Sequence, residues 1–144
     1  MKDSYIYPAI VSFDSDGISI EFPDLPGCLP SATNEEEIFR VAKEALELHL
    51  YGMEEDNEEI PEASKLPNIS LEENQIVLLV EAWMIPLRDK MATKSINKMV
   101  TIPKWLIEAA DRKNVNYSQV LQQSLKDYLG VYDYMQARKD KKKV

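Results

Sequence analysis

The sequence predicts an α+β protein made of two modules in series. An antiparallel sheet with one helix comes first, and one strand with two short helices follows. Residues 5–13 and 18–22 show the two-residue apolar period of β-strands. Apolar side chains then recur at helical spacing over residues 34–52. From residue 96 onward a second, shorter strand pattern precedes two amphipathic helical patterns.

The chain is predicted to begin with a β-hairpin. The turn residues Asp14-Ser15-Asp16-Gly17 separate the first two strands, and they suit a turn because glycine tolerates positive φ and aspartate bonds nearby backbone. The loop at residues 23–28 contains two prolines, which cannot donate to a sheet ladder. We therefore expect this loop to leave the sheet.

A helix, an acidic loop and a third long strand complete the first module. Asn34 is a predicted helix N-cap, with Glu37 three residues later as in a capping box, and the helix should end near Gly52. Residues 54–62 are interpreted as a solvated acidic loop that returns the chain to the sheet. Residues 75–84 are almost continuously apolar, which predicts a central strand covered on both faces.

The second module is predicted over residues 96–130, after a linker at residues 91–95. Pro103 closes its strand and suits the start of a helix, Asn116 can cap the second helix, and Gly130 can end it. So few apolar residues are marginal as an independent core but suit half of an intertwined dimer. The ribbon-helix-helix dimer has this order of elements and lays a two-stranded ribbon in the major groove of DNA. The alternative is an edge strand and helical hairpin packed on the first module.

Charge divides the chain at almost the same place. Residues 1–94 carry 7 basic and 20 acidic side chains, a net charge of −13, whereas residues 95–144 carry 10 and 5, a net charge of +5. Because salt screens charges beyond ~10 Å, each segment presents its own charge to a partner. The first module, residues 1–90, therefore suits a basic partner, and the second suits DNA. Residues 131–144 are expected to form a frayed, charged tail.

The predicted DNA contacts lie on one face of the ribbon and at the start of the last helix. Pairing two copies of the strand would place Asn97, Met99 and Thr101 of each copy on one face, where side chains reach base edges. Lysines add contacts to phosphates, and the helix amides near Tyr117 can hold a phosphate. The predicted set is Asn97, Lys98, Met99, Thr101, Lys104, Tyr117 and Ser118.

The sequence offers little for catalysis, so we expect no enzyme, no cofactor and no metal. The only histidine, His49, lies on the apolar side of a predicted helix, and the only cysteine, Cys28, is expected to be a small buried apolar residue. One cysteine also excludes an internal disulfide. No run of ~18 apolar residues or apolar signal core is present, so a soluble cytoplasmic protein is expected.

These residues resemble a known family, the HicB antitoxins of bacterial HicA–HicB toxin–antitoxin systems. The resemblance rests on the motif Pro23-Asp24-Leu25-Pro26-Gly27-Cys28, the return segment Ile60-Pro61-Glu62-Ala63-Ser64, and the segments at residues 100–106 and 117–122. It implies a partial ribonuclease-H-like fold for residues 1–90, without a working nuclease centre, and a C-terminal ribbon-helix-helix domain.

The resemblance also implies a function. The first module would bind a small basic HicA-type toxin, an mRNA ribonuclease with a double-stranded-RNA-binding-like fold, and cover its catalytic histidine. The dimeric second module would bind its own operator and repress the operon. We expect carboxylates to steer the toxin and the loop apolar groups to hold it, at Glu21, Asp24, Leu25, Pro26 and Gly27.

Two departures from the family and two other functions remain open. Met99 stands where the family usually has a polar residue, which leaves contact with a thymine methyl group, and Lys98 stands at a ribbon-core position and can extend to phosphate. One alternative is a Mg²⁺-dependent nuclease using Glu21, Asp24 and Glu81. The other is a ribbon-helix-helix repressor whose first module senses a small ligand.

Overall fold

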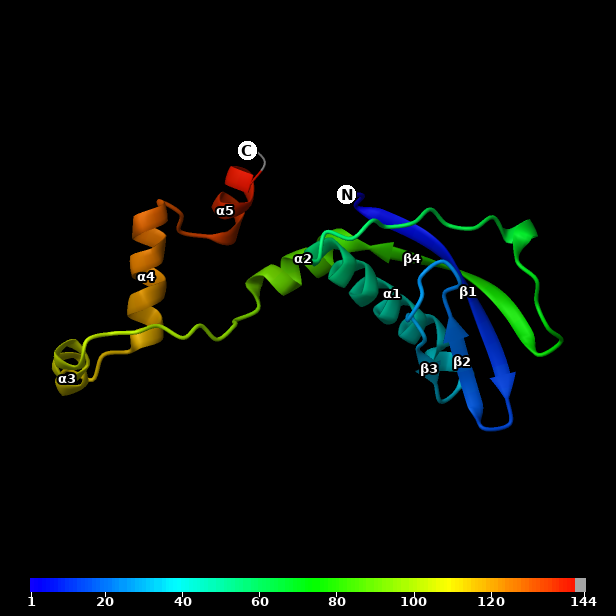
Figure 1. The fold of residues 1–144 in the computed structure, drawn as a ribbon, viewed down its shortest axis with the longest axis horizontal. Helices are drawn as coiled ribbons and strands as arrows, with labels where there is room; N and C mark the ends of the chain where they lie inside the picture. The colour runs from blue at the N-terminus through cyan, green and yellow to red at the C-terminus, as the bar shows by residue number, and fades with distance from the viewer. Residues whose placement is uncertain (142–144) are drawn as a thin grey trace. The chain divides into compact units, whose positions relative to one another are not determined.

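The computed structural model describes residues 1–141, which belong to two compact units (Figure 1). The first unit is residues 1–91, and the second begins at Ala92.

The first unit is a four-stranded antiparallel sheet with the order β3-β2-β1-β4. Strand β1 (Ser4–Asp14) is central, and β2 (Gly17–Glu21) returns beside it through the predicted hairpin, in which Asp14 pairs with Gly17. Gly17 has a φ of 149°, the conformation for which a glycine was expected. The short strand β3 (Ser31–Ala32) forms one edge and β4 (Gln75–Trp83) the other.

The prediction that residues 75–84 form a central strand covered on both faces is wrong. β4 is an edge strand, and on its outer face Leu79 and Trp83 are 51% and 55% exposed. A continuous apolar run has the same sequence signature in a doubly covered strand and in a strand whose open face is also apolar. Here the one long helix covers a single face of the sheet (Figure 1).

That helix, α1 (Ile38–Glu55), follows a short 3₁₀ turn, η1 (Glu35–Glu37). The predicted N-cap is confirmed, because Asn34 Oδ1 accepts the Glu37 N–H at 3.2 Å. The Glu37 carboxylate turns instead to Thr33, accepting from its hydroxyl at 2.6 Å and its N–H at 3.3 Å, so the capping box is displaced by one residue. The helix also runs past Gly52 to Glu55, since one glycine is tolerated inside a helix.

The described core lies between α1 and the inner face of the sheet. Every fourth residue on one side of α1 is buried, and so are alternate residues of β1 and β4. The loop after β2 contributes three more side chains, including the predicted small buried cysteine. The main members are Tyr7, Ala9, Val11, Ile20, Phe22, Leu25, Cys28, Ala42, Leu46, Leu50, Val80 and Ala82.

A long connection from residue 56 to residue 74, with one 3₁₀ turn η2 (Leu66–Asn68), leads to β4. Helix α2 (Met84–Thr93) follows β4 directly, so the first residues of the predicted linker are helical. Pro86 sits in the first turn of this helix, where its missing N–H costs nothing. Arg88 ties α2 to Glu54 at 2.6 Å and to Asp3 at 2.9 Å.

The second unit contains α3 (Lys104–Arg112), α4 (Tyr117–Leu129) and α5 (Tyr134–Lys141). Both predicted helix signals of α4 are confirmed. Asn116 Oδ1 accepts the Gln119 N–H at 3.1 Å, and Gly130 adopts a φ of 70°.

Two predictions for the second unit differ from the structure. The predicted strand at residues 96–102 has no regular secondary structure, and no other described segment pairs with it as a strand requires. The expected frayed tail contains α5, which Asp133 caps by accepting the Gln136 N–H at 2.8 Å. Residues 142–144 of that tail lie outside the described residues. Within the described part of the chain, no helix is both long and apolar enough to cross a membrane.

Candidate protein and nucleic-acid interfaces

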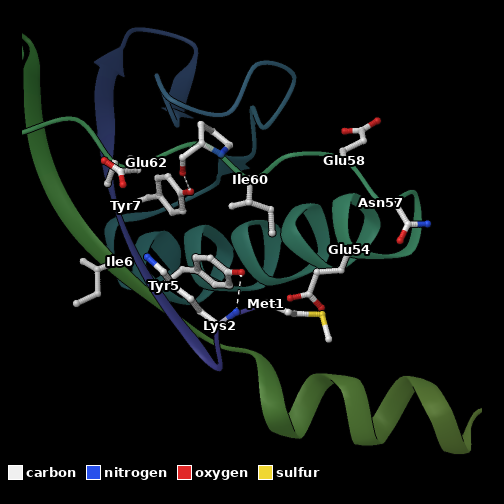
Figure 2. A pocket seen from close by; sticks show the side chains of 12 residues that line it. Met1, Lys2, Tyr5, Ile6, Tyr7, Glu54, Asn57, Glu58, Ile60 and Glu62 are labelled. Atoms are coloured by element: carbon white, nitrogen blue, oxygen red, sulfur yellow. Dashed lines mark hydrogen bonds between the residues drawn. The ribbon is translucent and has the colours of Figure 1, made fainter. Parts of the chain in front are cut away.

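The first unit carries an acidic ridge, which we define as residues 54–62, with a hollow on each side. One hollow, of about 660 Å³, lies between the ridge and the start of β1 (Figure 2). The other, of about 770 Å³, lies between the ridge, α1 and the loop after β2. Carboxylates line both hollows, and Glu58 is shared by the two: Glu54, Glu58 and Glu62 line the first, and Asp24, Asp56, Glu58 and Glu59 the second.

Two side chains fix the course of the ridge and of the residues after it. The Tyr7 hydroxyl donates a hydrogen bond to the Pro61 carbonyl (Figure 2). Burial, with the nearby Tyr5 and Asp24, raises the pKa of Tyr7, so the hydroxyl stays protonated as a donor. The Asp24 carboxylate accepts from the Ser64 N–H at 2.9 Å and from the Ser64 hydroxyl at 2.5 Å. Hydrogen bonds therefore hold the chain at Pro61, near the end of the ridge, and again at Ser64, just after it.

Most carboxylates of the ridge are available to a partner. Among the described residues, Glu54 is the ridge carboxylate with an ion pair, to Arg88. Glu55, Asp56, Glu58, Glu59 and Glu62 are exposed, and no described lysine or arginine lies within ion-pair distance of them. Like charges held this close repel one another in the free protein. A cationic surface would relieve that repulsion.

The residues predicted to bind a toxin occupy different environments. Glu21 is exposed at the end of β2, and Pro26 and Gly27 are exposed at the tip of the loop, where Gly27 has a φ of 89°. Leu25 is 1% exposed and belongs to the core, and the Asp24 carboxylate is engaged by Ser64. Sequence reasoning interpreted the ridge only as a solvated loop, although its run of acidic residues was the signal of this surface.

The residues considered for catalysis lie apart. Asp24 bonds Ser64 beside the ridge, whereas Glu81 lies on the open face of the sheet and accepts a hydrogen bond from the Ser4 hydroxyl at 2.8 Å. In the described part of the chain no three His, Cys, Asp or Glu side chains gather as metal ligands. His49 is half-buried on α1, and burial raises the pKa of the Cys28 thiol to about 11, which keeps it protonated and unreactive.

The second unit has helices but no closed core. From Ala92 to Arg138, where side chains are described, none is buried. Its apolar residues instead line one concave surface of about 400 Å³, which we call the apolar groove. Residues 100–102 contribute one wall of the groove, and α3, α4 and the turn between them contribute the other. The lining includes Val100, Ile102, Leu106, Ala110, Val115, Val120 and Leu121.

All seven predicted DNA-binding residues are exposed in the second unit. Met99 is 96% exposed, and Lys104 is paired only with Glu108 on its own helix at 3.7 Å. Tyr117 is held by its hydroxyl, which donates to Asp111 and lies 3.3 Å from the Ile107 carbonyl, and Asp111 raises the pKa of this hydroxyl. The N–H groups of Tyr117 and Ser118 precede the first hydrogen bond within α4 and can donate to a phosphate.

The chain matches one protein-family model and one phage protein. The family model described as "HicB_like antitoxin of bacterial toxin-antitoxin system" matches residues 7–125. An uncharacterized 14.9 kDa protein in the rep-hol intergenic region of Haemophilus phage HP1 (strain HP1c1) is 31% identical over 110 residues, which are 74% of this chain and 80% of the phage protein.

Two solved structures align with this chain, and the first of them is similar in fold. A toxin–antitoxin complex from Streptococcus pneumoniae contains a chain with a TM-score of 0.56 and 21% identity, over 87% of this chain and 99% of that one. The Burkholderia pseudomallei antitoxin HicB gives a TM-score of 0.49 at 17% identity, over 87% and 98%. At these identities the likeness concerns the arrangement of the backbone alone.

Proposed function

The chain belongs to the HicB-like antitoxins of bacterial toxin–antitoxin systems, and we propose that it performs this role with two separate surfaces. The acidic ridge binds a small basic HicA-type ribonuclease and covers its active site. The second unit dimerises as a ribbon-helix-helix module and binds the operator of its own operon. This division assigns the protein no catalytic step of its own.

One observation carries the toxin-binding half of the proposal: five exposed carboxylates, none with an ion pair among the described residues, stand together on a ridge that hydrogen bonds hold in place. A protein that cleaves RNA presents positive charge around its active site, because it must bind phosphates. Complementary charge raises the rate of encounter and selects the partner. The exposed loop tip at Pro26 and the half-buried Met53 add apolar contacts beside the second hollow.

The second unit supports the dimeric half. Helices α3 and α4 present an apolar groove with no buried side chain, and the segment at residues 96–102 has no strand partner within the chain. A second copy supplies both missing parts at once, because two such segments form an antiparallel ribbon and two grooves close over each other. The family's usual C-terminal arrangement points to the same partner.

The test of toxin binding uses the whole protein and the small basic protein encoded beside its gene. We expect Glu58→Gln, Glu59→Gln and Glu62→Gln together to slow association by about tenfold or more at low salt, with a smaller effect at high salt. The matched control is Glu35→Gln with Glu36→Gln and Glu44→Gln, which removes three exposed charges around α1. Stopped-flow association and RNA cleavage report the result, and equal slowing by both triple variants would contradict a role for the ridge.

A further inference from the structure

The outer edge of β4 is unpaired at three alternate residues in the middle of the strand. The Met84 N–H donates to the Asp3 carbonyl at 2.9 Å, and the Phe13 N–H donates to the Asn74 carbonyl at 3.0 Å. Because backbone groups of successive strand residues point to opposite sides, the even-numbered residues of β4 bond β1 and the odd-numbered ones point away from it. Strand β4 is the last in the sheet order, so nothing in the sheet receives these groups (Figure 1).

Both ends of this free edge are closed by the chain itself. The Gln75 N–H donates to the Glu72 carbonyl at 3.1 Å, and the Trp83 N–H donates to the Glu47 carboxylate at 3.3 Å. Between them, the N–H and C=O groups of Val77, Leu79 and Glu81 have no hydrogen-bond partner among the described residues. The free segment is therefore centred on Leu79.

This edge also lacks the features that normally prevent strand addition. Residues 75–83 contain no lysine, arginine or proline, and the register with β1 runs without a bulge. Leu79 is 51% exposed at the centre. Soluble proteins usually block a long apolar edge with charge, proline or a covering segment, because such an edge pairs with other strands.

We propose that β4 pairs antiparallel with β4 of a second copy, about a two-fold axis at Leu79. Leu79 then faces Leu79 of the second copy, and Val77 faces its Glu81. Each free N–H meets a free C=O, giving six hydrogen bonds from the six free groups that each copy supplies. The Gln75 and Trp83 N–H groups, which are bonded within the chain, then lie opposite each other.

Because this edge is self-complementary, the strand that pairs with it is β4 of a second copy. A two-fold pairing needs an edge whose free groups are symmetric about one residue, and that is what the closures at Gln75 and Trp83 produce. The charges are compatible as well: each Glu81 faces a valine, and the two Glu81 carboxylates stand ~14 Å apart, beyond the screening length in physiological salt. This interface lies in the first unit and does not depend on the ribbon-helix-helix proposal.

Register-specific cross-linking of the full-length protein tests the pairing. Each variant carries Cys28→Ala to remove the native thiol. Leu79→Cys should form covalent dimers on mild oxidation, or with a short reagent that joins two thiols, because directly opposed residues have Cα atoms ~5.5 Å apart. Val77→Cys is the matched control on the same edge and face, and its copies lie ~14 Å apart. We expect Leu79→Cys to cross-link at least about tenfold faster.

Two further measurements make the outcome decisive. Mixing Val77→Cys with Glu81→Cys should restore cross-linking, because these residues face each other across the axis. Circular dichroism melts verify that each variant is folded. Equal cross-linking by Leu79→Cys and Val77→Cys, or none by any folded variant, would overturn the proposal. So would a Leu79→Cys thiol that stays monomeric in the free protein and becomes protected only when the basic neighbouring protein is added.

Discussion

Removing the guanidinium of Arg88 should destabilise the first unit by about 3 kcal/mol. Arg88 donates twice to Glu54, at 2.6 and 2.9 Å, and once each to the Asp3 carboxylate and the Lys2 carbonyl. The Glu54 side chain is only 6% exposed and that of Arg88 18%. Breaking a buried ion pair costs ~3–5 kcal/mol because a desolvated charge is left alone, and the partial exposure of Arg88 favours the lower end.

Urea unfolding of Arg88→Ala, followed by circular dichroism, measures this loss of free energy. Two variants separate the buried pair from the exposed one. Asp3→Asn should cost less than about 1 kcal/mol, because the Asp3 side chain is 68% exposed. Arg88→Met combined with Glu54→Leu should recover most of the stability, since no unpaired charge remains. The reasoning fails if Arg88→Ala unfolds within about 1 kcal/mol of the wild type, or if Asp3→Asn costs as much.

Three further predictions follow from the two units. Ending the chain after Thr93 should leave a folded fragment that self-associates more weakly than the full chain and only through β4, because the described core lies entirely in the first unit and the apolar groove is lost. A fragment as strongly dimeric as the full chain in sedimentation would contradict the role of the apolar groove. Thr101→Ala should weaken operator binding by ~1–3 kcal/mol. Lys104→Ala should weaken the binding of specific and non-specific DNA alike and flatten its salt dependence. Unchanged DNA binding in both variants would exclude this face as the DNA-binding surface. Hydrogen bonds from the Thr33 hydroxyl and, to a lesser extent, the Thr33 N–H lower the pKa of Glu37 below 4.5. The ionised Glu37 carboxylate therefore stabilises the fold above about pH 4.5, and this stabilisation is lost as pH falls through the lower folded pKa. The stability difference between wild type and Glu37→Gln should therefore shrink in acid, and a difference that is constant with pH would refute this.

Local patterns predicted the elements whose signals are contained in a few neighbouring residues. The Asp14–Gly17 turn, the Asn34 and Asn116 caps and the Gly130 stop are of this kind, because each depends on one side chain and backbone groups within three or four residues. The family resemblance added the order of the modules. The helix over residues 134–141 escaped prediction because its polar sequence has no apolar period.

Features set by distant contacts could not be predicted in this way. The position of β4 at the edge depends on which strand pairs with β1, and an apolar run does not specify that. Asp24 was expected to face a toxin, whereas its carboxylate binds Ser64, forty residues later. The acidic ridge likewise forms as a surface only because Tyr7 and Asp24 hold it beside α1. The segment at residues 96–102 has a strand-like sequence pattern but forms no strand in the single chain, because a strand also needs a partner strand.

The most direct test of the division of labour uses residues 1–93 alone with the purified basic protein encoded beside the gene. If the first unit inhibits by covering an active site, saturating fragment should suppress RNA cleavage as completely as the full chain, although it lacks the second unit. The fragment should at the same time fail to bind operator DNA. RNA cleavage that continues undiminished at saturating folded fragment would contradict the central claim.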